Sequence, residues 1–65
     1  MSVELPVRLG REGQTATWNP AMTRARQVLL RVRVADGAVE ERRSLNSGRA
    51  RVREGEKIEA VLADD

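Results

Sequence analysis

The stretch RQVLLRVRVADGAVEERRS, residues 26–44, decides the fold prediction. Over residues 28–34, every second side chain is apolar, which is the period of a half-buried β-strand. A helix is the alternative, because some apolar residues also share helical spacing: Met22, Ala25, Leu29 and Val32. Valine-rich segments prefer strands, so we predict a strand here. The Asp36-Gly37 pair that follows is a strong signal for a β-hairpin.

The second half of this stretch predicts an edge strand. A two-residue turn at Asp36-Gly37 pairs Val34 with Val39 and Arg33 with Glu40. Beyond that point the segment EERRS offers nothing apolar, so the returning strand can bury only Val39 and, near its end, Leu45. We therefore predict a short, twisted edge strand whose charges discourage pairing with other chains, or which serves as a docking edge. The candidate docking residues are Glu40, Glu41, Arg42 and Arg43.

Alternation also marks strands before this hairpin. VELPVRL, residues 3–9, predicts a half-buried strand with its odd-numbered apolar residues facing inward, and Pro6 favours an edge position. GREGQ, residues 10–14, predicts a turn, and TATW, residues 15–18, a short strand. Asn19 before Pro20 is typical of a helix start, so one or two helical turns are expected there.

The last third of the chain predicts a second hairpin after a turn at LNSG, residues 45–48. A three-residue loop at 54–56 pairs Val52 with Ile58 and Arg51 with Glu59. The apolar residues Ile58, Ala60 and Leu62 then share one face. Together these patterns predict one all-β domain, residues 1–65, folded as a small antiparallel barrel or sandwich of five to six short strands with one short helical turn after Asn19.

Composition argues against catalysis. A 65-residue chain has a small core, and this one contains no cysteine or histidine, which excludes disulfides and removes the commonest transition-metal ligand and neutral-pH base. Trp18 is the only aromatic residue and is expected in the core. No serine has a base that the sequence places beside it, and no loop has calcium-ligand spacing. We therefore expect no enzyme activity, no catalytic residue, no metal or cofactor, and no small-molecule substrate.

Charge is distributed unevenly along the chain. Residues 23–53 contain nine arginines against three acidic residues, whereas residues 54–65 have a net charge of −4. If the corresponding strands are neighbours, five arginines share one face that could attract nucleic-acid phosphates: Arg31, Arg33, Arg49, Arg51 and Arg53. The absence of stacking aromatics and the predicted pairs Arg33–Glu40 and Arg51–Glu59 favour a solvated, internally balanced face instead.

These observations favour a binding role. The core is small and has no disulfide or metal, the charge is asymmetric, and edge strands offer free backbone groups to a partner. We expect a non-enzymatic structural or protein-interaction subunit that docks on a protein partner or self-associates within a larger assembly, for example a virion. A small nucleic-acid-binding β-barrel is the alternative. With no signal-peptide pattern and no apolar run long enough to span a membrane, the expected location is the cytoplasm or an assembly formed there.

Overall fold

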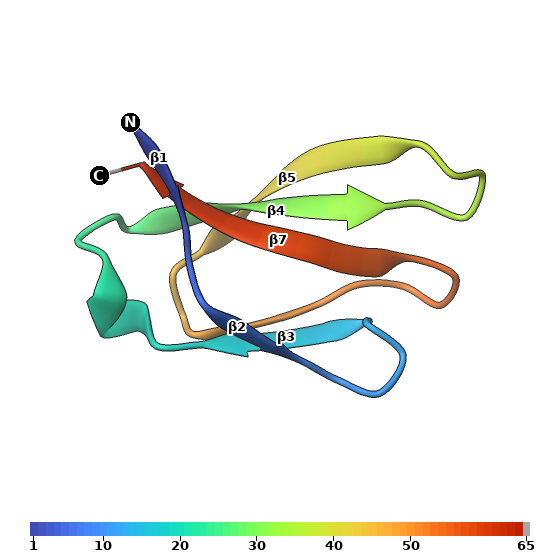
Figure 1. The fold of residues 1–65 in the computed structure, drawn as a ribbon, viewed down its shortest axis with the longest axis horizontal. Coiled ribbons are helices and arrows are strands. Elements are labelled where there is room, and N and C mark those ends of the chain that lie inside the picture. The colour runs from blue at the N-terminus through green and yellow to red at the C-terminus, as the bar shows by residue number, and fades with distance from the viewer. Residues whose placement is uncertain (65) are drawn as a thin grey trace.

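The computed structural model describes residues 1–64, which form strands and one short 3-10 turn (Figure 1). The predicted all-β class is confirmed, with seven strands in this range because residues 3–9 contribute to two strands instead of one. The elements are β1 (Ser2–Glu4), β2 (Val7–Leu9), β3 (Thr15–Trp18), the 3-10 turn η1 (Pro20–Met22), β4 (Gln27–Arg33), β5 (Val39–Leu45), β6 (Arg49–Arg51) and β7 (Lys57–Asp64).

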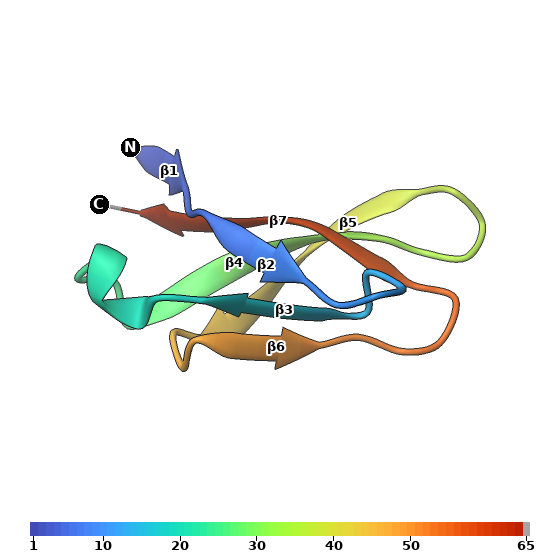
Figure 2. The ribbon, with the colours of Figure 1, turned by 60° about the horizontal axis from the view of Figure 1, so that its bottom comes forward.

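The strands form two antiparallel sheets that face each other across the core. One sheet has the order β1-β7-β4-β5 and the other β2-β3-β6 (Figure 2). Within residues 1–64, four chain segments pass from sheet to sheet: two short corners, at Leu5-Pro6 and at residues 46–48, and two longer connections, at residues 19–26 and 52–56. The fold is therefore a sandwich whose two sheets share two corners, which brings it close to a closed barrel.

The first corner explains why the N-terminal strand differs from its prediction. Leu5 is buried, with 4% of its surface exposed, and its N–H donates to the Val61 carbonyl at 2.8 Å. Pro6, which has no N–H to donate, occupies the crossing itself. Val3 and Leu9 lie farther from the corner and are 41% and 45% exposed, so the prediction that all odd-numbered side chains point inward is wrong at both ends. The predicted edge position is confirmed for both halves, since β1 and β2 each end a sheet.

Strand β4 supplies the centre of the core, as its alternation predicts. Val28, Leu30 and Val32 are at most 5% exposed and pair with buried residues of β7. A β-bulge at the Arg31/Val32 step leaves Glu59 of β7 without a partner on β4. This extra residue changes which β7 side chains enter the core. Ile58 points inward as predicted, and Val61 and Ala63 join the core cluster, whereas Leu62 is only half-buried. Ala60 is also buried, at 3% exposed, but lies outside that cluster.

The hairpin at Asp36-Gly37 is confirmed, but its register is one residue from the predicted one. Arg33 lies opposite Val39 instead of Glu40, because the loop contains three residues, 35–37. The Gly37 N–H donates to the Val34 carbonyl at 2.9 Å, and Gly37 has a φ of +94°. This positive φ at the end of a three-residue loop is the conformation that glycine adopts most easily.

Strand β5 is an edge strand, as predicted, but it is not short. It has seven residues and pairs with β4 along its whole length. The expectation that it buries Val39 and Leu45 is also wrong, since these side chains are 46% and 69% exposed. The one-residue register change is the cause, because it turns every side chain of the strand to the opposite face of the sheet.

The predicted pairing of β6 with β7 is wrong. Ala50 of β6 lies opposite Ala16 of β3, in the other sheet. The expected turn exists, with the Glu56 N–H donating to the Arg53 carbonyl at 3.0 Å, but it carries the chain between sheets. A favourable local register does not fix a strand's partner when another strand with an unpaired edge, here β3, can accept it.

Trp18 and Asn46 connect the core to the second corner. Trp18 is 7% exposed, as expected for a core residue, and its indole N–H donates to Asn46 Oδ1 at 2.8 Å. The Asn46 amide group donates to the carbonyls of Pro20 and Ala25, each at 3.0 Å. The predicted helical turn is confirmed as η1, with the Asn19 side chain accepting from the Ala21 N–H at 3.0 Å.

Candidate interaction surfaces

One side of β5 has no strand beside it. In an antiparallel pair, the main-chain groups of alternate residues point to the same side. Val34 N donates to the Ala38 carbonyl at one end of the β4–β5 ladder, and Asn46 N donates to the Arg26 carbonyl at the other, both at 2.9 Å. Even-numbered residues of β5 therefore bond to β4, and the main-chain groups of odd-numbered residues face away from it. We call this side of β5, residues 39, 41, 43 and 45, the free edge.

The side chains of the free-edge residues are also exposed. Glu41 and Arg43 make no side-chain hydrogen bond or ion pair with any residue in the range 1–64. Val39 and Leu45 present apolar surface at the two ends of the same row. One main-chain group is engaged, because the Leu45 carbonyl accepts from Ser47 N at 2.8 Å and from the Ser44 hydroxyl at 3.2 Å. The predicted docking residues thus divide into Glu41 and Arg43 on the free edge and Glu40 and Arg42 on the other face.

Arg42 points toward the interior side of the sheet, because it lies directly opposite the buried Leu30. Its guanidinium donates to both oxygens of Glu56, at 2.9 Å and 2.6 Å, and to Glu40 at 3.0 Å. Glu56 belongs to the turn between β6 and β7, and only 13% of its side chain is exposed. Arg42 therefore spans the space between β5 and this turn, where the apolar core ends. A two-pronged pair of this kind fixes orientation as well as charge.

The same contacts shift the ionisation of Glu56. Its hydrogen bonds with Arg42, and then the one from the Arg53 N–H at 3.1 Å, lower the pKa of Glu56 from 4.5 to about 2. The pKa of Arg42 is raised by its hydrogen bonds with Glu56 and Glu40. Both groups therefore stay charged at neutral pH. The sequence prediction did not include Glu56, because its partner Arg42 faces the interior only in the observed register.

The five arginines proposed for nucleic-acid binding are divided between the sheets. Arg31 and Arg33 lie on β4, whereas Arg49 and Arg51 lie on β6, and Arg53 follows β6. Strands β4 and β6 are not neighbours, so the condition for one shared arginine face is not met.

Two predicted charge pairs also differ from the structure. Arg33 pairs with Glu59, the extra residue of the bulge, and donates to the Gly37 carbonyl at 2.9 Å, so neither Arg33–Glu40 nor Arg51–Glu59 is formed. Nucleic-acid binding stays a prediction from the sequence.

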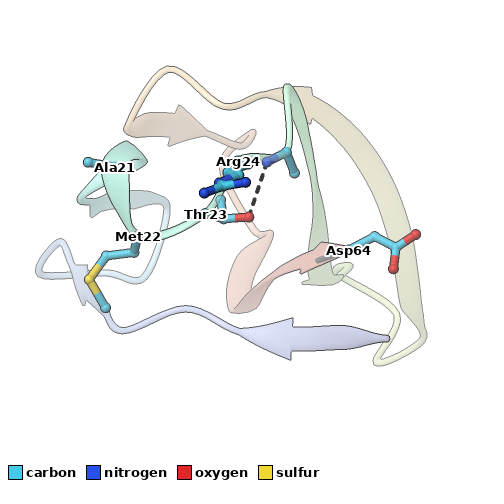
Figure 3. Close-up of a pocket in the computed structure, with 6 residues that line it drawn as sticks. Ala21, Met22, Thr23, Arg24 and Asp64 are labelled. Atoms are coloured by element: carbon cyan, nitrogen blue, oxygen red, sulfur yellow. Dashed lines mark hydrogen bonds between the residues drawn. The ribbon is translucent and has the colours of Figure 1, made fainter.

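An open depression of about 580 Å³ lies at the end of the fold that carries the termini (Figure 3). It is lined by residues 21–25 and Asp64, and Figure 3 shows Met22 and Asp64 on opposite sides of it. The Thr23 hydroxyl accepts from the Ala25 N–H at 3.2 Å, and the Asp64 carboxylate binds the N-terminal amine at 3.0 Å.

Within residues 1–64, no three acidic, histidine or cysteine side chains are grouped as metal ligands. In the same range, no helix has the length and apolar character needed to cross a bilayer. No protein-family model, curated protein sequence or solved structure matches this chain. Its function therefore has to be inferred from its own geometry.

Proposed function

We propose that this chain is a non-catalytic protein-interaction subunit that docks into a larger assembly, such as a virion, through the free edge of β5. The observation that supports this proposal is the free edge itself, which combines unpaired main-chain groups with exposed apolar and charged side chains over seven residues. A partner strand can extend such a sheet, with main-chain hydrogen bonds providing affinity and side chains providing specificity.

The chemistry of the chain supports a role in binding instead of catalysis. The sequence offers no histidine or cysteine as a base or nucleophile. Strand β5 is also held in place from two directions, by its ladder with β4 and by the Arg42–Glu56 contact. A pre-ordered strand loses little conformational freedom when a partner binds, which favours association. A cytoplasmic location remains part of this proposal, because the sequence contains no apolar run approaching the length of a membrane span.

Two substitutions at Glu41 test this proposal. Glu41→Pro removes one N–H from the free edge and no bond from the β4–β5 ladder, whereas Glu41→Ala keeps the N–H and removes only the carboxylate. We expect a tagged wild-type chain to retain its partner on purification, Glu41→Ala to retain most of it, and Glu41→Pro to lose it. Circular dichroism confirms that both variants are folded. Equal retention by a folded Glu41→Pro variant would contradict docking at this edge.

A further inference from the structure

We propose that the partner at the free edge is a second copy of this chain, with the two β5 strands antiparallel about a twofold axis at Arg42. This inference rests on the proposed function and identifies the partner of the same edge. It would join two four-stranded sheets into one continuous sheet. In a twofold interface both copies contribute the same surface, so that surface has to be complementary to itself.

The order of side chains along the free edge meets this requirement. Only odd-numbered residues of β5 have outward main-chain groups, so odd-numbered residues must face each other across the axis. When VEERRSL, residues 39–45, runs antiparallel to itself about Arg42, Val39 faces Leu45 of the second copy and Glu41 faces its Arg43. The twofold axis generates the same two pairs again on its other side. Every facing pair of odd-numbered residues is then either apolar with apolar or acidic with basic.

Other registers lose this match. A shift that keeps the outward main-chain groups facing each other moves the strand by an even number of residues. The nearest shifts place Glu41 opposite Glu41 of the second copy, or Arg43 opposite its Arg43. Like charges directly opposite each other destabilise a strand pair, so the charge pattern selects the register centred on Arg42.

The free edge lacks three of the features that block such pairing in other proteins. Proteins protect edge strands with proline, bulges or very short strands. Here the two prolines lie at the β1–β2 corner and at the start of η1, the bulge is on β7, and β5 is seven residues long. Its charges do not block pairing, because they alternate in sign in the order that a second copy complements.

Arg42 is the one residue that meets its own copy at the axis. Its guanidinium is bound by Glu56 and Glu40 of its own chain, so each positive charge already has acidic partners. These contacts reduce the repulsion between the two Arg42 side chains. A seven-residue edge covers less than the roughly 1,200–2,000 Å² of a stable standard interface, so we expect a reversible dimer that forms at high concentration.

A charge exchange tests the pairing. Sedimentation equilibrium from micromolar to millimolar concentration should show the wild-type chain approaching twice the monomer mass. Glu41→Arg alone and Arg43→Glu alone place like charges in both facing pairs, and each should raise the dimer dissociation constant about tenfold. The double variant restores opposite charges and should recover wild-type association. The matched controls are Glu12→Arg and Arg11→Glu, which make the same charge changes on exposed turn residues and should leave association unchanged.

Amide hydrogen exchange identifies the edge that pairs. The amides of Glu41 and Arg43 should exchange more slowly as concentration rises, whereas those of Glu40 and Arg42 are protected by β4 at every concentration. A folded double variant that remains as weak as the single variants would overturn the register. A wild-type chain that stays monomeric at millimolar concentration would overturn self-pairing, and the proposed function would still stand if Glu41→Pro abolished capture of another protein. If Glu41→Pro also left that capture unchanged, both proposals would fall.

Discussion

Strands β4 and β5 are neighbours of equal length with opposite chemistry. Each has seven residues, and they are paired from end to end. The inward side of β4 carries Val28, Leu30 and Val32, all buried, whereas no residue of β5 is buried. The residue opposite Leu30 is Arg42, whose guanidinium binds Glu56 in the turn between β6 and β7. The comparison shows that the apolar core ends between these two strands, and that hydrogen bonds and charge hold the outer strand.

The largest expected loss of stability comes from removing apolar volume from the buried side of β4. Leu30→Ala should destabilise the fold by about 2–5 kcal/mol, because it leaves a cavity in the core. A domain of this length has a total stability of about 3–10 kcal/mol, so a large part of the population should unfold. Leu45→Ala removes the same atoms from the exposed end of β5 and should change the free energy of unfolding by less than about 0.5 kcal/mol. Urea unfolding of dilute protein measures both, and similar losses would remove the distinction between the strands.

Asn46 should give the next largest effect. Asn46→Ala removes the acceptor of the Trp18 indole N–H and the donors to two carbonyls, which leaves partly buried polar groups without partners. We expect a loss of about 1–3 kcal/mol in the free energy of unfolding. Ser44→Ala, two residues earlier on the same face, is the control and should cost less than about 0.5 kcal/mol. If the two variants unfolded at the same urea concentration, the second corner would not depend on Asn46.

The Arg42–Glu56 contact predicts a pH dependence. The pKa of Glu56 is about 2 in the folded chain and 4.5 without its partners, so protonation favours the unfolded state. The stabilising contribution is fully present above pH 4.5 and is lost as the pH falls through 2. Urea unfolding from pH 7 to pH 2 should show Glu56→Gln less stable than wild type at pH 7 and nearly equal to it at the acid end. Glu54→Gln, an exposed neighbour, should follow the wild-type curve.

The smallest expected effect belongs to the free edge of the isolated chain. Glu41→Ala and Arg43→Ala remove exposed side chains that make no hydrogen bond or ion pair within residues 1–64, so each should change stability by less than about 0.5 kcal/mol in dilute solution. Thermal unfolding at micromolar concentration measures this. A clear loss of stability at that concentration would show that these side chains support the monomer fold and are not reserved for a partner.

Local patterns predicted the elements better than their partners. The alternation over residues 28–34, the turn residues at Asp36-Gly37 and the helical start at Asn19 were all interpreted correctly. The partner of β6 was not, because local pairing energies favour a hairpin with β7, whereas the fold pairs β6 with the open edge of β3. The register of β5 was missed by one residue, since the loop includes Ala35 and the sequence does not show where a glycine takes a positive φ.

The candidate site was predicted in part. The sequence placed the four charged residues 40–43 on an edge strand, and the structure confirms that position. It could not show which of them face outward, because that depends on the register. Glu56 was missed for the same reason, since no pattern near residue 56 indicates that Arg42 approaches it across the end of the core.

By itself, the sequence determined that this protein is built from short strands, where most of its turns lie, and that Trp18 and the valines of residues 28–32 form the core. These features follow from side-chain period and turn preference, which act over a few residues. Only the tertiary structure decided the strand partners, the bulge at Glu59, the interior position of Arg42 and the identity of the free edge. Each of these depends on how two sheets close around a shared interior, and that closure joins residues far apart in the chain.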